Sequence, residues 1–140
     1  MEAVFVYGTL KHGYRNHCIV EYSEYFADAN TVDSYNFFTL GWFPAVAKTG
    51  NKDLDLYKID GEIYKVDSRV MKDLDHLESN GQLYQRRIRD FEVLLNGEVS
   101  VMKAWMYELI AETYGAAPES ALHRPDQFMI SGDVASWYCD

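Results

Sequence analysis

The sequence predicts an α+β fold, and three observations support this fold class. Short apolar stretches typical of strands outnumber helical segments along the 140 residues. Asn96-Gly97, the strongest short hairpin signal, joins two of these stretches directly. A parallel α/β fold needs a crossover between successive strands, and hairpins do not. We therefore expect about five or six strands, about two or three short helices, and a single domain over residues 1–140.

The first half of the chain is divided by glycines and a proline. Val4 to Tyr7 is apolar throughout, which predicts a strand covered on both faces, and residues 9–13 form a loop between glycines. A short helix is expected at residues 15–25. A strand is expected at residues 34–40, and Pro44 should break regular structure soon after it, before a turn at residues 49–53.

The second half shows clearer strand and helix signals. Tyr57 to Val66 predicts a strand in which Gly61 marks a bulge or a close backbone approach. Ser68 or Asp67 can cap a helix that ends near Glu78. The two strands around Asn96-Gly97 are expected at Ile88–Leu95 and Val99–Leu109.

Charge and composition exclude several classes of protein. Twenty-two acidic residues against 13 basic ones give a net charge of −9, which disfavours binding to nucleic acid or to an anionic membrane. The sequence shows neither a signal peptide nor a stretch long enough to span a membrane, so we expect a cytoplasmic protein. As a separate expectation, the protein is a monomer or weak homodimer. Cys18 and Cys139 are expected to be reduced thiols.

Glu78 is the first candidate for chemistry. On a helical wheel it falls among Val70, Met71 and Leu74, whereas the acidic and basic residues of the same helix, Asp75 included, fall outside this arc. Burial and the negative end of the helix dipole both favour the neutral carboxyl, so its pKa should be raised, as suits a general acid or base. The alternative is a structural ion pair with Arg86 or Arg87.

The loop Tyr7-Gly8-Thr9-Leu10-Lys11 is the second candidate. A glycine directly after a buried strand lets the backbone approach a ligand, and successive N–H groups can hold a carboxylate or an oxyanion. The alternative is a plain turn between the strand and the next element. The loop matches neither the Walker nor the dinucleotide-binding glycine pattern.

Other common catalytic patterns are weak or missing. The four histidines, at positions 12, 17, 76 and 123, have no metal-binding spacing, and no serine lies in a nucleophile elbow. A His–Cys nucleophile around Cys18 has little support, because proximity in sequence does not place a base against the thiol. We therefore expect no metal and no cofactor. The arginines of residues 86–89 are expected on a charged edge strand.

An ordered set of motifs covers nearly the whole chain. It comprises Val4-Phe5-Val6-Tyr7-Gly8-Thr9-Leu10-Lys11 with Gly13 and Asn16, then Phe43-Pro44-Ala45-Val46, Gly61-Glu62-Ile63-Tyr64-Lys65-Val66, Leu74-Asp75-His76-Leu77-Glu78 with Tyr84 and Arg86, and Ile130-Ser131-Gly132-Asp133. Together they resemble the γ-glutamyl cyclotransferase-like family, in the AIG2-like branch that includes the γ-glutamylamine cyclotransferases. The chain departs from the family pattern at Ser79-Asn80, which precede Gly81, and at Val134, where the family often has Trp.

The resemblance implies a fold, a site and a reaction. The fold would be a small mixed β-barrel with short flanking helices. Glu78 would be the catalytic acid/base, and the loop Tyr7-Gly8-Thr9-Leu10 would bind a small-molecule γ-glutamyl substrate. Across the turn at residues 79–83, Tyr84 is expected to orient Glu78 or a substrate carboxylate; the alternative is an ordinary half-buried strand tyrosine. The substrate's own α-amine attacks its γ-carbonyl, so 5-oxoproline forms and an amine or peptide leaves. An alternative is a non-catalytic metabolite-binding module on the same fold, or a protein-interaction module that uses aromatics around Tyr35 to Phe43.

Overall fold

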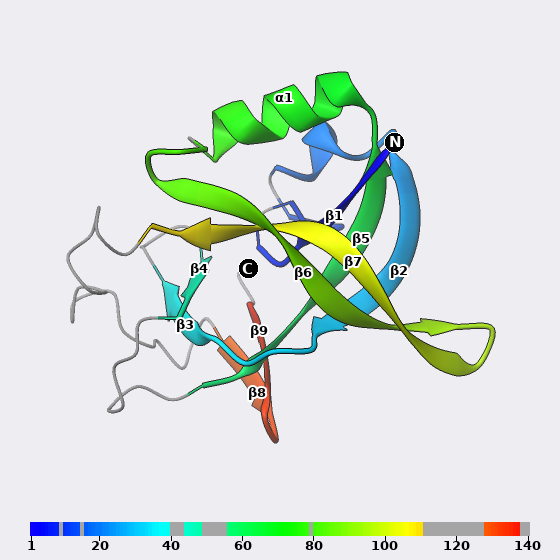
Figure 1. Ribbon diagram of the computed structural model, residues 1–140, viewed down its shortest axis with the longest axis vertical. Helices are drawn as coiled ribbons and strands as arrows, with labels where there is room; N and C mark the ends of the chain where they lie inside the picture. The colour runs from blue at the N-terminus through cyan, green and yellow to red at the C-terminus, as the bar shows by residue number, and fades with distance from the viewer. Residues whose placement is uncertain are drawn as a thin grey trace.

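The computed structural model describes residues 1–8, 10–14, 16–39, 44–48, 56–78, 80–110 and 128–137 (Figure 1). The elements in chain order are β1 (Glu2–Val6), the 3-10 turn η1 (His17–Ile19), β2 (Glu24–Thr31), β3 (Asn36–Thr39), β4 (Pro44–Ala47), β5 (Lys58–Val66), α1 (Ser68–Leu77), β6 (Tyr84–Leu95), β7 (Glu98–Leu109), β8 (Phe128–Ser131) and β9 (Val134–Trp137).

Five of the strands close into a barrel. The main sheet has the order β1-β7-β6-β2-β5-β9-β8, and β1 also pairs with β5, which joins the two sides of the sheet. β1 runs parallel to β7, and β9 runs parallel to β5, whereas the other pairings are antiparallel. β3 and β4 form a separate two-stranded sheet. The α+β class and the mixed barrel are thus both confirmed.

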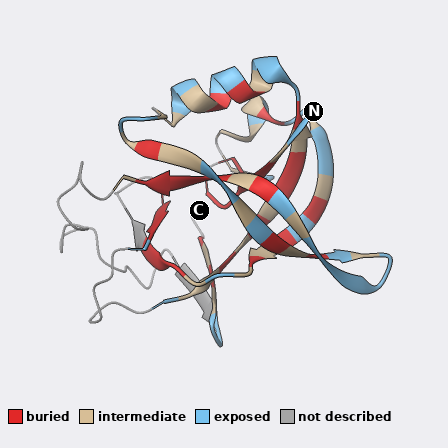
Figure 2. Ribbon diagram, viewed as in Figure 1, coloured by how far each residue is buried: buried red, intermediate tan, exposed pale blue. Residues whose placement is uncertain are grey.

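β1 separates two apolar layers, which explains why its sequence is apolar at successive positions. Val4 and Val6 face outward and pack with Met71 and Leu74 of α1, whereas Phe5 packs inside the barrel. Because the helix covers the outer face, both faces of this strand are buried, as the sequence predicts (Figure 2).

α1 begins and ends where the sequence predicts. Asp67 caps it, its side chain accepting a hydrogen bond from the backbone N–H of Val70 at 2.9 Å. Met71 and Leu74 are its buried residues, and Glu78 is the residue that caps its C-terminus. The helix therefore presents the Glu78 side chain where α1 leaves the barrel surface.

The β6–β7 hairpin is also as predicted, with longer strands. Asn96 and Gly97 both have positive φ, 52° and 81°, as a two-residue hairpin turn requires. The register pairs Leu95 with Glu98 and continues to Tyr84 opposite Leu109. Figure 1 shows the turn end of this hairpin projecting away from the barrel.

Two expectations for the first half are wrong. Residues 15–25 do not form an α-helix: three residues form η1, and β2 begins at Glu24. The inward side chains of β2 include Ala27 and Ala29, which are too small to give a strong strand signal. Pro44 does not break regular structure but opens β4, a position where a strand tolerates proline.

The expected number of elements also needs correction. The described residues contain nine strands and a single α-helix, because β2, β4 and the C-terminal pair β8–β9 add to the predicted strands. β6 lies between β7 and β2 in the sheet and is not an edge strand, although β2 pairs only with its Phe91–Val93 part. The turn predicted at residues 49–53 lies outside the described residues.

Gly61 of β5 marks a close approach between strands. A Cβ added there would lie 2.3 Å from the carbonyl oxygen of Val6 and 2.6 Å from the ring of Phe5. The predicted close backbone approach is therefore confirmed, and only glycine fits between β5 and β1 at this point.

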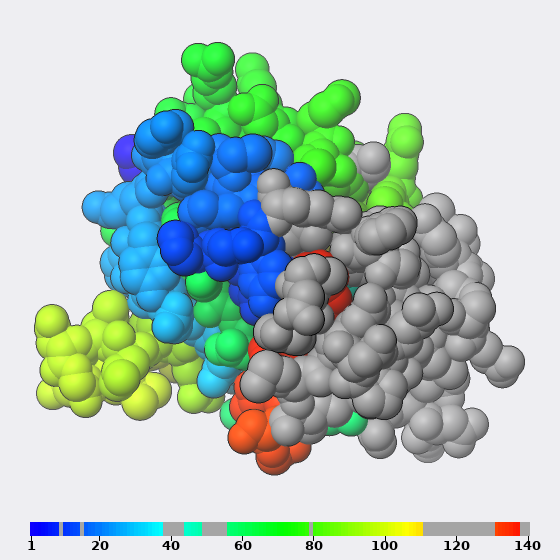
Figure 3. Space-filling view, turned by 180° about the vertical axis from the view of Figure 1, so that it is seen from behind, coloured from blue at the N-terminus to red at the C-terminus, as the bar shows by residue number. Residues whose placement is uncertain are grey.

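The loop after β1 lies beside the C-terminal strand β9. Lys11 donates a hydrogen bond of 3.0 Å from Nζ to the carbonyl oxygen of Trp137 in β9. Figure 3 shows part of the N-terminal segment in blue next to C-terminal residues in red. Among the described residues, no helix combines the length and apolar character that crossing a membrane requires.

Candidate active site

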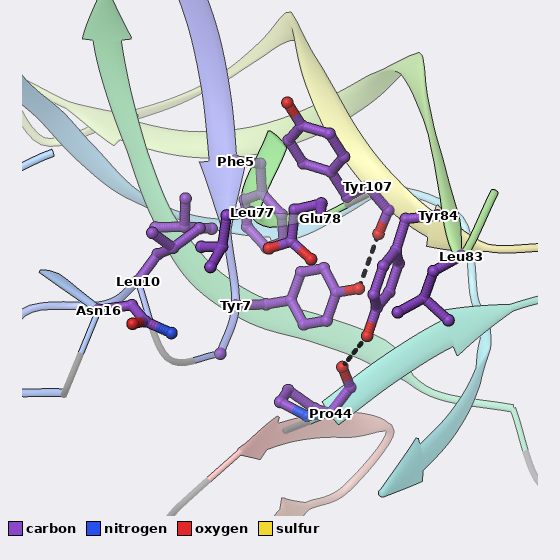
Figure 4. Close-up of a pocket in the computed structure, with 12 residues that line it drawn as sticks. Phe5, Tyr7, Leu10, Asn16, Pro44, Leu77, Glu78, Leu83, Tyr84 and Tyr107 are labelled. Atoms are coloured by element: carbon purple, nitrogen blue, oxygen red, sulfur yellow. Dashed lines mark hydrogen bonds between the residues drawn. The ribbon is translucent and has the colours of Figure 1, made fainter. Parts of the chain in front are cut away.

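A pocket of about 270 Å³ opens at the end of β1. Segments that are distant in sequence meet there: the start of the loop after β1, the end of α1, the start of β6, the end of β7 and the start of β4 (Figure 4). The lining residues are Phe5, Val6, Tyr7, Gly8, Leu10, Asn16, Pro44, Leu77, Glu78, Leu83, Tyr84 and Tyr107. Among the described residues of this lining, Glu78 is the one that is acidic or basic.

Glu78 reaches the pocket because of its position at the end of α1. Its backbone N–H donates to the carbonyl oxygen of Leu74 at 2.9 Å, which continues the last helical turn. In Figure 4 its carboxyl group points into the pocket near the ring of Tyr7. The structure therefore places Glu78 on the inward side of the helix end, as the helical wheel predicts.

Burial raises the pKa of the Glu78 carboxyl from 4.5 to about 7. Desolvation is the cause, since the apolar walls stabilise the neutral acid over the carboxylate. Burial raises the pKa of the Tyr7 hydroxyl, and the negative charge of the Glu78 carboxylate raises it further. A carboxyl group that titrates near neutral pH can both accept and return a proton.

Glu78 does not form the alternative ion pair with Arg86. The Arg86 guanidinium pairs with Asp75 instead, with 2.8 Å between Nε and Oδ1. Asp75 was expected to be solvated, but it is only partly exposed and also accepts a hydrogen bond of 2.6 Å from the Tyr107 hydroxyl. Arg87 is exposed on β6, and the described ion pairs do not include Glu78.

The loop after β1 contributes three of its predicted residues to the pocket. Tyr7, Gly8 and Leu10 line it, and Thr9 lies outside the described residues. The Tyr7 hydroxyl donates a hydrogen bond of 2.7 Å to the carbonyl oxygen of Tyr107, which fixes its ring as a wall of the pocket. The carbonyl oxygen of Gly8 accepts from the N–H of Lys11 at 3.0 Å, so the loop turns tightly.

Tyr84 lines the pocket, and its hydroxyl is directed to β4. It donates a hydrogen bond of 2.9 Å to the carbonyl oxygen of Pro44, and the residue is 2% exposed. No described hydrogen bond joins Tyr84 to Glu78. The expected role of Tyr84 in orienting Glu78 or a substrate carboxylate therefore stays a prediction, and its described contact is with a pocket wall.

Sequence reasoning missed Tyr107 as a pocket residue. It lies opposite Arg86 in the β6–β7 register, its hydroxyl binds Asp75 of α1, and its carbonyl holds Tyr7. Asn96-Gly97 fixes this register, so counting back along both strands would have paired Tyr107 with Arg86. The contributions of Asn16 and Leu83 depend on tertiary packing, and the sequence alone gave no signal for a pocket role.

Taken together, the fold and this pocket define a class of protein. Its members are small mixed barrels with one flanking helix, and a buried carboxyl group at the end of that helix lies beside the loop after the first strand. The model of the family described as "Gamma-glutamyl cyclotransferase, AIG2-like" matches residues 4–127. The chain therefore belongs to this family, and it is an enzyme of the γ-glutamyl cyclotransferase type.

Individual relatives agree with this family. A putative γ-glutamylcyclotransferase of Vibrio cholerae is 35% identical over 83 residues, which are 59% of this chain and 67% of that protein. γ-Glutamylaminecyclotransferase B of Danio rerio is 35% identical over 76% of this chain and 59% of its own length. The crystal structure of an AIG2-like protein from Mus musculus superposes with a TM-score of 0.69 at 28% identity, covering 85% of this chain and 81% of that one.

Proposed function

We propose that the protein cyclises the γ-glutamyl group of a γ-glutamyl amine or peptide. The α-amino nitrogen attacks the γ-carbonyl carbon, the bond from that carbon to the leaving nitrogen breaks, and 5-oxoproline and a free amine are the products. The nucleophile belongs to the substrate, so this reaction requires neither a catalytic serine nor a catalytic cysteine.

Glu78 is the proposed acid/base. The α-amine arrives as an ammonium group, so one base must take a proton before the nitrogen can attack. The same group can return that proton to the leaving nitrogen when the tetrahedral intermediate collapses. A carboxyl with a pKa of about 7 suits both steps near neutral pH. This raised pKa, in a pocket whose other described lining residues are uncharged, is the observation that carries the proposal.

The loop after β1 is the proposed holder of the γ-glutamyl group. Gly8 lies on the pocket wall, where a backbone without a side chain lets a ligand come close. Backbone N–H groups of the loop, including that of Thr9, would hold the α-carboxylate or the developing oxyanion. Donors of this kind let a protein of net charge −9 bind an acidic substrate. Tyr84 would complete the pocket wall beside Glu78.

The shape of the pocket also favours an intramolecular reaction. Tyr7 is fixed by Tyr107, and Tyr84 is fixed by Pro44, so two aromatic walls are held in place before a ligand arrives. Such walls can keep the γ-glutamyl arm folded with its amine near its carbonyl, which lowers the entropic part of the barrier.

The test is to incubate the protein with a panel of γ-glutamyl amines, γ-glutamyl amino acids and glutathione, and to detect 5-oxoproline by mass spectrometry. We expect 5-oxoproline and the free amine to appear in equal amounts from at least one member. Binding of panel members without any product would instead support a non-catalytic metabolite-binding protein. If no member binds or reacts, the proposed substrate class is wrong.

A further inference from the structure

Asp75 of α1 binds the Arg86 guanidinium of β6 and the hydroxyl of Tyr107, a residue that lines the pocket. We infer that Asp75 is a positioning residue whose task is to keep the charge of Arg86 away from Glu78, so that Glu78 remains a carboxyl without a cationic partner. This inference rests on the proposed function, because it explains how the proposed acid/base keeps its proton affinity.

The contacts of Asp75 are short and converge on one oxygen. Its Oδ1 accepts from Nε of Arg86 at 2.8 Å and from the Tyr107 hydroxyl at 2.6 Å. The side chains of Arg86 and Asp75 are 24% and 27% exposed, so solvent screens this pair less than a surface pair. Arg86 belongs to β6 and Tyr107 to β7, so Asp75 also connects α1 to both strands of the hairpin.

Two further contacts keep Arg86 in place. Its guanidinium lies over the ring of Trp105, 4.3 Å from the ring centre, and the Trp105 indole N–H donates to Glu2 at 2.9 Å. The backbone N–H of Arg86 donates to Oδ1 of Asn80 at 3.0 Å. The arginine is therefore held between β7 and the turn that follows α1.

Without Asp75, Glu78 would be the neighbouring carboxyl for this guanidinium. Asp75 and Glu78 are three residues apart at the end of one helix, so they lie on adjacent parts of its surface. Burial and the hydrogen bond to Asp75 raise the pKa of the Tyr107 hydroxyl, and the positive charge of Arg86 partly opposes this rise. Tyr107 lines the pocket, so the Asp75–Arg86 pair lies against one of its walls. Among the described ion pairs, Asp75 is the partner of Arg86.

The groups that line the pocket around Glu78 include no permanent cation among the described residues. β1 and β7 contribute Tyr7 and Tyr107, β6 contributes Tyr84, and the segment before η1 contributes Asn16, whereas Arg86 of β6 is bound to Asp75 and does not line the pocket.

The histidines of neighbouring elements are engaged elsewhere or lie outside the pocket. The His17 ring on η1 forms a hydrogen bond of 3.0 Å with the carbonyl oxygen of Leu10, and His76 on α1 is exposed to solvent. Arg86 is therefore the cation that Asp75 is inferred to hold away from Glu78.

The experiment is a set of charge variants read by the titration of the Glu78 carboxyl in carbon-13 NMR, alongside the acid limb of the pH profile of kcat/KM. Asp75→Asn keeps the shape and the acceptor oxygen but leaves Arg86 unpaired. We expect the Glu78 midpoint and the acid limb to move to lower pH by about one unit or more, the usual effect of a cation beside a carboxyl.

Two further variants reverse the effect. Arg86→Gln leaves the Asp75 anion unbalanced, so the Glu78 midpoint should rise. Asp75→Asn combined with Arg86→Gln replaces two opposite charges by two uncharged side chains, so the net charge beside Glu78 is unchanged. The midpoint should therefore return to that of the unsubstituted protein. Asp90→Asn is the matched control, because the Asp90–Lys103 pair, 2.8 Å long, is exposed on the hairpin away from the pocket. It should leave the midpoint unchanged.

A midpoint that stays constant in folded Asp75→Asn, or that moves equally in Asp75→Asn and the double variant, would overturn the inference. If Asp75→Asn does not fold, the other two variants decide: the midpoint must rise in Arg86→Gln and return in the double variant. The titration needs no substrate. A protein that forms no 5-oxoproline would therefore reject the proposed function without obscuring the midpoints.

Discussion

At the scale of single residues, the burial of Glu78 links the site to the stability of the protein. Its carboxyl has a pKa of about 7 in the folded state against 4.5 for an ordinary glutamate, so the folded protein holds this proton more tightly than the unfolded chain does. Stability from this group is complete below about pH 4.5 and is lost as the pH rises to about 7.

Glu78→Gln should therefore stabilise the protein at high pH and have little effect at low pH. The neutral amide avoids the burial of a carboxylate, so we expect a gain of roughly 2–3 kcal/mol in the free energy of unfolding at about pH 8. At about pH 4 the two proteins should differ little, because both carry a neutral group. Urea unfolding at the two pH values measures the difference. A variant that is less stable than the parent at the higher pH would identify Glu78 as a structural ion-pair residue.

The sequence predicts single residues well where one helix decides their position. The inward direction of Glu78 follows from the helical wheel, and the burial that results raises its pKa. The contribution expected from the helix dipole stays a prediction. Asp75 was placed in solvent because a helical wheel contains no information about β6 and β7, which supply its partners. The Tyr84 hydroxyl similarly finds its acceptor on β4, forty residues away in sequence.

At the scale of elements, the end of β1 is shaped by its contact with β4. A Cβ added to Gly8 would lie 2.7 Å and 2.8 Å from two ring carbons of Pro44, too close for an ordinary contact. The carbonyl oxygen of Pro44 also holds Tyr84, so a displaced β4 would disturb a second wall of the pocket. The glycine is therefore needed for the shape of the site.

Gly8→Val should abolish binding of a γ-glutamyl ligand while the barrel still forms. The added side chain displaces Pro44 or fills ligand space, and neither effect breaks a barrel pairing. Calorimetry measures the affinity, and circular dichroism checks the fold. Ser100→Val, which introduces valine at an exposed position of β7, is the control and should bind the γ-glutamyl ligand normally. Unchanged affinity in Gly8→Val would remove this loop from the site.

Elements with strong local signals are predicted correctly, and those held by distant partners are missed. The hairpin has Asn96-Gly97, and α1 has its cap at Asp67 and an apolar face. β2 has no comparable signal, because its inward residues include Ala27 and Ala29, and its strand form depends on pairing with β5 and β6.

At the scale of the whole molecule, barrel closure brings the parts of the site together. β1 pairs antiparallel with β5 and parallel with β7, so the loop after β1 meets the end of α1 and the end of β7. These contacts join residues about a hundred positions apart, such as Tyr7 and Tyr107. Local patterns do not specify such pairings; the sequence supported the barrel only through its resemblance to a family.

The architecture also places Cys18 away from the proposed chemistry. Cys18 is exposed on η1 and does not line the pocket, and Cys139 lies outside the described residues. Replacing both by serine should therefore keep turnover near that of the parent, as measured by 5-oxoproline release. A large loss of activity with an unchanged circular dichroism spectrum would support a thiol mechanism instead.

The most direct test of the central claim, that Glu78 moves the proton in γ-glutamyl cyclisation, is to compare turnover and binding in Glu78→Gln with the same reactive substrate. The amide keeps the shape of the side chain but cannot take the ammonium proton. We expect calorimetry to show retained binding, and 5-oxoproline release to fall by roughly 10²-fold or more. Normal release of 5-oxoproline by a folded Glu78→Gln would contradict the account.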